Sequence, residues 1–426
     1  MTAAEPRSCC AEYAAAGISR RGLLRAAGAA AALSTTSVFG SAVVSTSFAP
    51  PAFGAVRPAG RVLVVLSMRG AVDGMSLVVP HGDPAYYAAR PRIGIPAERL
   101  LAKDGFFGLH PNLAPLLPLW ESGRMASVHA TGLAVPNRSH FAAMEAVEDA
   151  DPGSRERVGW LNRLIARDAY DHPLRAVGVG TSTPPTSLYG ARATSAYRDV
   201  KSMALAGADG DQGPRRRRSL QTMWGGVDGP LGASARSAMA AVADFGPVRA
   251  VPEQAQHGAT YPRGDLASAL AGVARTIRGD VGAEVFTVDH GDWDHHSDLG
   301  TLEWGSMQKM AGDFAQALAA FFTDLGPLAD RVTVVTISEF GRRTRENANY
   351  GLDHGHGNVM LLLGAGVNGG YHGRWPGLTD SSDGDLLVTT DYRSVLAEVA
   401  AARLGASPAQ TFPGFSPESV GAVSSL

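Results

Sequence analysis

Short apolar runs alternate with longer segments of helical period along this chain. The runs cover residues 61–67, 125–129, 283–288, 331–337 and 359–363, and most are rich in Val, Ile or Leu. Apolar runs of this length are typical of strands whose two faces are both covered. The sequence therefore predicts an α/β protein built on a mostly parallel sheet.

Helices are expected between these strands. One is predicted over 265–277, and another where apolar residues recur at helical spacing as core positions, at Met307, Met310, Phe314, Leu318, Phe321 and Leu325. The order of strand 283–288, helix and strand 331–337 predicts parallel pairing of the two strands through a right-handed crossover. Asp289–His296 and Glu339, which follow these strands, should then share one edge of the sheet.

Titratable residues gather at that predicted edge. Residues 289–296 include three Asp and three His, and more follow the next strand. Carboxylate oxygens with imidazole nitrogens suit zinc, manganese, iron or calcium. Neither an HExxH nor a CxxC motif occurs, and a hydrogen-bonded loop without metal is the alternative reading. The metal ligands predicted at this edge are Asp294, His296, Glu339, Asp353, His354 and His356.

Further candidates come from other loops. Asp73 follows the first strand, where a metal ligand and an Asp-Gly turn are both consistent with the sequence. Ser139 begins a predicted helix over 139–148, either as its N-cap or as a nucleophile that uses the positive helix end. We group His140 with Ser139 as catalytic. Arg342 is expected to contact an anion, with a surface salt bridge as the alternative.

The N-terminus resembles a twin-arginine export signal. Ser19-Arg20-Arg21-Gly22-Leu23-Leu24-Arg25 precedes an Ala-rich run that ends at Leu33 and is too short to span a bilayer. We expect cleavage between residues 42 and 55 and a periplasmic or extracellular protein without stable membrane insertion. Both cysteines, Cys9 and Cys10, precede the signal, so the mature chain has no disulfide framework.

Size and charge limit the remaining possibilities. The chain has 426 residues, 45% of them hydrophobic, and a formal charge of -2, which argues against nucleic acid as a partner. Residues 1–55 are predicted as signal and linker, and 56–426 as one domain with a less regular insertion at about 178–263. The one basic run, 215–218, is expected in a solvated loop, and contact with an anion or polymer is the alternative.

Six motifs together resemble the DUF1501 family, exported proteins related to the alkaline phosphatase and sulfatase superfamily. They are MRGAVDGMSLVVP (68–80), RSHFAAMEAVE (138–148), GDWDHH (291–296), SEFGRRTREN (338–347), DHGHGNVMLLLG (353–364) and TTDYR (389–393). The resemblance implies a three-layer α/β/α sandwich of the alkaline phosphatase type, with a metal site on loops at the carboxyl edge of the sheet.

The resemblance also implies roles for individual residues. Asp73 matches a metal aspartate and Ser139 the nucleophile position. Asp294 and His296 would form one ligand group, and Glu339 with His354 or His356 the other. Superfamily hydrolases usually carry Asp-His where this chain has Glu339-Phe340, a departure that removes one imidazole ligand of a two-metal site.

Three functions are consistent with these features. The first is an exported metal-dependent hydrolase of a small-molecule or polymeric phosphate or sulfate ester. The second is a non-catalytic exported protein that keeps at most one metal and binds a polymer or an exported protein partner. The third, a carbohydrate or lipid-headgroup transferase, would use the same site with a different acceptor.

Overall fold

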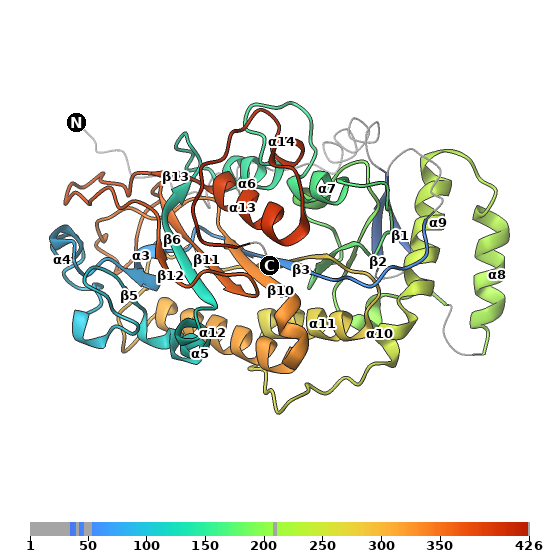
Figure 1. Ribbon diagram of the computed structural model, residues 1–426, viewed down its shortest axis with the longest axis horizontal. Coiled ribbons are helices and arrows are strands. Elements are labelled where there is room, and N and C mark those ends of the chain that lie inside the picture. The colour runs from blue at the N-terminus through green and yellow to red at the C-terminus, as the bar shows by residue number, and fades with distance from the viewer. Residues whose placement is uncertain (1–34, 40–41, 47–52, 208–210, 425–426) are drawn as a thin grey trace, which may run out of the picture.

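The computed structural model describes residues 35–39, 42–46, 53–207 and 211–424. The predicted twin-arginine motif and both cysteines lie outside these residues, so export and processing stay predictions. Within the described residues one 11-stranded sheet crosses the molecule (Figure 1). In sheet order its strands are β1 (Thr35–Phe39), β2 (Ala42–Thr46), β8 (Thr194–Tyr197), β7 (Ala176–Val179), β9 (Val285–His290), β3 (Val62–Met68), β10 (Val332–Ile337), β11 (Asn358–Gly364), β6 (Met125–Gly132) and β12 (Gly370–His372), with β13 (Thr390–Asp391) also paired to β6.

The middle of the sheet is parallel. β8, β7, β9, β3 and β10 all run in one direction, while β11 runs antiparallel to both β10 and β6. We had expected β9 and β10 to pair directly. They do not, because β3 lies between them. All seven residues of β3 are buried, and such a strand is stable only in the interior of a sheet. The carboxyl ends of β9 and β10 still share one edge, as predicted.

Helices cover both faces of the sheet, which confirms the predicted three-layer α/β/α sandwich (Figure 1). The residues of β3 alternate between the layers, since Val64 and Leu66 belong to one core and Leu63 and Val65 to the other. On the first face lie α5 (Leu117–Glu121), α10 (Gly246–Ala250), α11 (Asp265–Gly279) and α12 (Ser306–Leu325), and on the second α6 (His140–Asp149), α7 (Trp160–Ile165), α13 (Tyr392–Leu404) and α14 (Pro408–Thr411).

Short elements complete the fold. They are α3 (Gly74–Leu77), α4 (Pro84–Ala89), the two-stranded sheet of β4 (Val78–Val79) and β5 (Gly108–Leu109), and the 3-10 helices η1 (Ala97–Arg99), η2 (Pro111–Leu116), η3 (Thr186–Leu188), η4 (Val200–Ser202) and η5 (Gly326–Arg331). The segment that begins at His110 forms η2 followed by α5. His110 does act at its start, because its Nδ1 accepts a hydrogen bond from the backbone N–H of Asn112.

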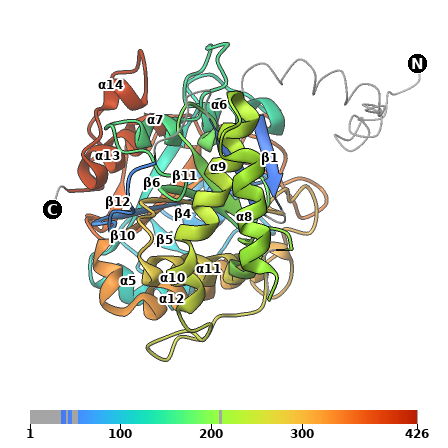
Figure 2. The ribbon, with the colours of Figure 1, turned by 90° about the vertical axis from the view of Figure 1, so that its right-hand side faces the viewer.

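The stretch 178–263, expected as an insertion, also contributes to the main sheet through β8. Its helices α8 (Gly213–Trp224) and α9 (Gly229–Asp244) stand beyond that strand, and α9 lies beside β1 and β2 (Figure 2). The basic run 215–218 is exposed, but it lies in α8 rather than in the predicted loop. β1 and β2 fall inside the stretch predicted as signal and linker. They form an antiparallel pair that extends the sheet, and β2 pairs antiparallel with β8. No helix in the described ranges is both long and apolar enough to cross a membrane.

Candidate metal centre

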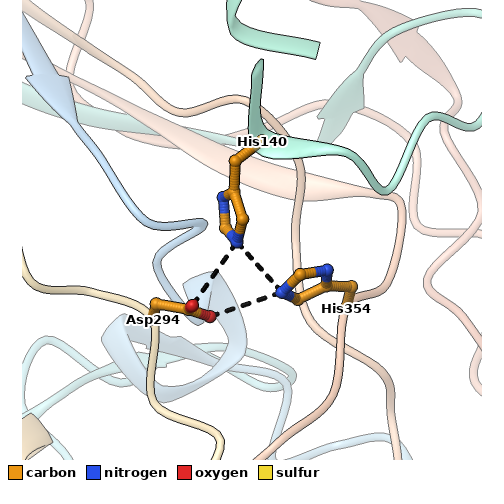
Figure 3. A group of neighbouring side chains, drawn as sticks. All are labelled: His140, Asp294 and His354. Carbon is orange, nitrogen blue, oxygen red and sulfur yellow. Dashed lines mark hydrogen bonds and ion pairs between the residues drawn. The ribbon is translucent and has the colours of Figure 1, made fainter. Parts of the chain in front are cut away.

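Four side chains meet beyond the carboxyl ends of the central strands. Asp294 and His296 lie on the loop after β9, His354 lies on the loop between β10 and β11, and His140 is the first residue of α6. Figure 3 shows His140, Asp294 and His354 pointing toward one another. We call these four residues the His–Asp cluster. It joins segments of the chain that are far apart in sequence.

A glycine allows two of these loops to touch. Gly70, in the loop after β3, has a φ of +103°, and a Cβ on it would lie 2.7 Å from the backbone N of Asp294. Only glycine tolerates both this conformation and this approach. The backbone N–H of Gly70 also donates to Oε1 of Glu339 at 2.9 Å. The MRGAVDG motif therefore supports the cluster through its backbone.

The ligand atoms of His140, Asp294 and His354 all lie within 4.8 Å of one another, close enough to share one ion, and His296 contacts the last two. Nε2 of His354 lies 3.0 Å from Nε2 of His140 and 2.9 Å from Nε2 of His296. Oδ1 of Asp294 lies 3.1 Å from Nε2 of His296 and 3.3 Å from Nε2 of His354, and its Oδ2 lies 3.5 Å from Nε2 of His140. Ligand atoms about 2.0–2.1 Å from a tetrahedral zinc ion are separated by about 3.3 Å. The observed spacing is close to that value.

Each imidazole is oriented by an acceptor on its other nitrogen. Nδ1 of His140 lies 2.8 Å from Oε1 of Glu339, Nδ1 of His296 3.1 Å from Oδ1 of Asp353, and Nδ1 of His354 2.9 Å from the carbonyl oxygen of residue 138. Carboxylate and carbonyl oxygens only accept, so Nδ1 carries the hydrogen in all three rings. In the neutral rings the Nε2 lone pair of His354 then faces those of His140 and His296, and a cation between them would relieve this repulsion. Metal-binding histidines are commonly held in this way.

Protons compete with a metal for the cluster. Burial lowers the pKa of His140, but hydrogen bonds to Asp294 and Glu339 outweigh this effect and raise the pKa to about 9. The pKa of His296 is raised, chiefly by its hydrogen bond to Asp294. Burial acts to raise the pKa of Asp294, yet its hydrogen bonds to the three histidines and to Arg342 hold that pKa far below the usual range. A metal that binds here must displace protons.

The family of the chain follows from a comparison of sequences. Residues 120–399, more than half of the chain, match the family described as a protein of unknown function, DUF1501. The chain belongs to the DUF1501 family. This confirms the family expected from the motifs, five of which lie inside the matched range. No curated protein matches the sequence.

Several solved structures share part of the arrangement of this DUF1501 protein. The C-terminal periplasmic domain of EcEptC from Escherichia coli, in complex with Zn, has a TM-score of 0.30 at 8% identity, covering 74% of this chain and 77% of that one. A protein in the alkaline phosphatase superfamily from Vibrio parahaemolyticus has a TM-score of 0.29 at 12% identity, covering 76% of this chain and 67% of that one. Phosphonate monoester hydrolase of Agrobacterium radiobacter has a TM-score of 0.31 at 10% identity, covering 82% of this chain and 74% of that one. Likeness at this level carries no conclusion about substrate or metal.

Asp73 is not part of the His–Asp cluster, contrary to our prediction. Its side chain is buried, and its two carboxylate oxygens lie 2.6 and 3.0 Å from the guanidinium nitrogens of Arg90. Ser76 Oγ donates to it as well, at 2.5 Å. Burial acts to raise the pKa of Asp73, but the Arg90 charge and hydrogen bonds keep it lowered. The carboxylate is therefore used in a buried ion pair.

Three other predicted ligands also lie outside the cluster. Glu339 and Asp353 accept hydrogen bonds from cluster histidines, and so they orient ligands instead of joining them. His356 is buried, and its Nε2–H donates to the carbonyl oxygen of Leu133 at 2.7 Å. That bond joins two loops around the site. Of the residues predicted as ligands, Asp294, His296 and His354 do meet.

The predicted catalytic residues have different surroundings. Ser139 precedes α6 as predicted, but its hydroxyl makes no capping hydrogen bond and its side chain is exposed. Arg342 is buried, and its guanidinium donates to backbone carbonyls and, at 2.6 Å, to Oδ1 of Asp294. It therefore fixes Asp294, where we had expected a contact with a substrate anion. His140, predicted as catalytic, belongs to the cluster.

Sequence reasoning missed two features of the site. The ligand position of His140 had a local signal, since a helix that begins at the sheet edge aims its first residue toward the site. The pairing of Arg90 with Asp73 had no signal in the sequence, because Arg90 is the C-cap of the short helix α4 and lies in no recognisable motif. Phe340 is buried beside the cluster, with its ring centroid 4.9 Å from those of His140 and His354. The departure Glu339-Phe340 thus fills space next to two ligands.

Proposed function

We propose that this DUF1501 protein is a metal-dependent hydrolase of a phosphate or sulfate ester, with one divalent ion held by the His–Asp cluster. The observation that carries the proposal is the convergence of His140, Asp294 and His354, whose ligand atoms all lie within 4.8 Å of one another, with His296 in contact with the last two and each ring fixed through Nδ1. Three nitrogen ligands and one oxygen favour zinc, manganese or iron over calcium, which prefers oxygen ligands. The side chains of the cluster are 15% to 38% exposed, so a substrate can reach them.

Ser139 is the proposed nucleophile. A bound divalent ion would act as a Lewis acid on an ester oxygen. Ser139 lies at the N-terminus of the ten-residue helix α6, where the helix dipole favours negative charge on the attacking oxygen and on the ester group. Its Oγ would form a bond to phosphorus or sulfur while the alcohol leaves, and water would then release the acid. A transferase would differ only in the second step, where an alcohol replaces water.

The cellular setting is proposed from the sequence. The Arg20-Arg21 pair supports export by the twin-arginine pathway to the periplasm or the outside of the cell. Replacing both arginines by lysine should keep the protein inside the cell. Cell fractionation of the two proteins measures this, and equal export of both would contradict the proposed pathway.

Metal content and ester cleavage together test the function. Purified protein should contain one divalent ion per chain, and Asp294→Ala should lose it. Ser139→Ala should keep the ion and lose cleavage across a panel of phosphate and sulfate esters. Because Ser139 is exposed, this variant should fold normally. Metal-free protein, with Asp294→Ala unchanged in stability, would rule out the metal site.

The second candidate is a non-catalytic exported protein that binds a polymer or an exported protein partner. Phe340 beside the cluster favours it, as does the Asp73–Arg90 ion pair, because the described residues then contain one possible ligand group. A folded, metal-loaded protein that cleaves no ester of the panel, and that co-purifies with another exported protein, would support this candidate over the hydrolase.

A further inference from the structure

Three large apolar side chains are exposed on segments that carry or adjoin residues of the His–Asp cluster. Val135 and Phe141 are each 75% exposed, and Leu387 is 61% exposed. We call these three residues the apolar rim. A ligand that covers these side chains would remove apolar surface from water without burying a polar side-chain group. The hydrophobic effect would then contribute favourably to the binding free energy. Single exposed apolar residues are ordinary, but a group of them beside a polar site indicates a binding surface.

The rim residues lie on the segments that build the cluster. Phe141 directly follows His140 in α6, and Val135 lies in the loop that leads to this helix. That loop accepts the hydrogen bond from His356 through its Leu133 carbonyl. The rim therefore begins one residue from a proposed metal ligand.

The third rim residue lies on a neighbouring segment. Residues 384–389 run beside the loop of Val135, because Arg138 forms an ion pair with Asp385 and the backbone N–H of Thr389 donates to Ala130 at 2.9 Å. Leu386 is buried, and its carbonyl oxygen accepts from the N–H of Gly357 in the loop that carries His354. Leu387 is thus exposed on a segment tied to the loop that precedes His140 and to the loop that carries His354.

Rim and cluster together have the composition of a small-molecule site. Such sites combine apolar walls with a few convergent polar groups that fix one end of the ligand. Here the polar end is the His–Asp cluster, which is continuous with the rim through His140 and Phe141. The remaining large apolar residues that are exposed in the described part of the chain include Met223, Val227 and Leu231, at α8 and the start of α9 beyond β8.

We propose that the apolar rim binds an aliphatic chain of the substrate, so that the enzyme acts on amphiphilic esters with an anionic head. The head would lie at the His–Asp cluster and the chain over Val135, Phe141 and Leu387. This inference rests on the proposed function for the head group. It adds a substrate class and three residues that determine specificity.

Alkyl phosphates of different length test the inference by binding alone. Calorimetry of the metal-loaded protein would compare ethyl phosphate with octyl phosphate below its micelle-forming concentration. Each methylene taken from water strengthens binding on the order of three- to fourfold, so covering two of the additional methylenes gives about tenfold. Octyl phosphate should therefore bind at least about tenfold more tightly than ethyl phosphate.

Matched triple variants locate the effect. Val135→Ser with Phe141→Ser and Leu387→Ser should bring the two affinities to within about twofold of each other while the metal content stays unchanged. The control replaces three exposed apolar residues far from the cluster by serine, at Met223, Val227 and Leu231, and should keep the full preference.

The other outcomes separate this inference from the proposed function. If the unaltered protein bound both phosphates equally, the apolar rim would not bind the alkyl chain, while the proposed ester site would be unaffected. If octyl phosphate binds equally well to Asp294→Ala, the head is not at the cluster, and the inference is wrong. If neither phosphate binds the metal-loaded protein, the proposed function fails and the rim inference fails with it.

Discussion

Replacing Arg90 by methionine separates the structural aspartate of the site from the metal-binding one. The side chains of Arg90 and Asp73 are 0% and 1% exposed, and two guanidinium nitrogens bind the two carboxylate oxygens. Arg90→Met leaves the Asp73 carboxylate buried with only the Ser76 hydroxyl as a strong partner. Breaking a buried ion pair by removing one partner costs about 3–5 kcal/mol. We expect a loss of this size in the free energy of unfolding.

The double variant removes the pair together with the hydrogen bonds from Arg90 to the carbonyl oxygens of Arg343 and Thr344. Asp73→Leu with Arg90→Met removes both charges and leaves apolar groups, and such replacements are often nearly neutral. The double variant should therefore be more stable than Arg90→Met alone. As a control, Lys309→Met breaks an exposed pair with Asp313, whose N–O distance is 2.8 Å, and should cost at most about 1 kcal/mol.

Urea unfolding of metal-free protein is the suitable assay, because bound metal would add its own stabilisation. Elemental analysis of the folded variants then measures metal content. Arg90→Met and the double variant should keep one ion per chain, since neither changes the His–Asp cluster. Loss of the metal from the double variant, to the extent seen for Asp294→Ala, would refute the assignment of Asp73 to a purely structural ion pair.

The remaining predictions concern the cluster and its surroundings. Glu339→Gln removes the carboxylate that orients His140 and should weaken metal binding about 10- to 100-fold in a competition titration, and an unchanged affinity would show that the ring needs no such partner. The raised pKa of His140 stabilises the metal-free protein fully below its unfolded value of 6.5, and this contribution is lost as the pH rises to about 9. Stability of the metal-free protein should thus fall over that range while metal affinity rises. If stability and metal affinity changed in the same direction with pH, protons and metal would not compete for His140. His356→Ala leaves the carbonyl of Leu133 without its donor and should lower the unfolding midpoint without changing the metal stoichiometry; loss of metal would instead make His356 a ligand.

Local patterns were sufficient to predict the layers of the fold and the edge that carries the site. Strands such as β3 and β10 are apolar at nearly every position, and their carboxyl ends could be located from the sequence alone. The meeting of Asp294, His296 and His354 was predictable because titratable residues cluster on two loops at that edge. The strand order could not be predicted, because the position of β3 between β9 and β10 depends on how completely each strand is covered in the folded molecule.

The division between metal ligands and their supporting residues could not be predicted. Asp353 and His354 are adjacent in sequence, yet one accepts from His296 and the other points its Nε2 into the cluster. Glu339 differs from a ligand only in facing Nδ1 of His140 instead of the shared centre. These differences come from distances of a few Å between loops, which no local pattern encodes.

Two buried arginines leave the described residues with one possible metal-binding group. Arg90 binds both oxygens of Asp73 and balances its negative charge, so that carboxylate attracts a metal ion less strongly. Arg342 binds only Oδ1 of Asp294, while Oδ2 faces His140 without an arginine contact. The first arginine therefore takes the place of a cation, whereas the second positions a ligand and weakens its charge. If the proposed hydrolysis uses one metal, that ion and the N-terminus of α6 would together stabilise the leaving group and the attacking oxygen, which would demand more of the helix than a two-metal site would.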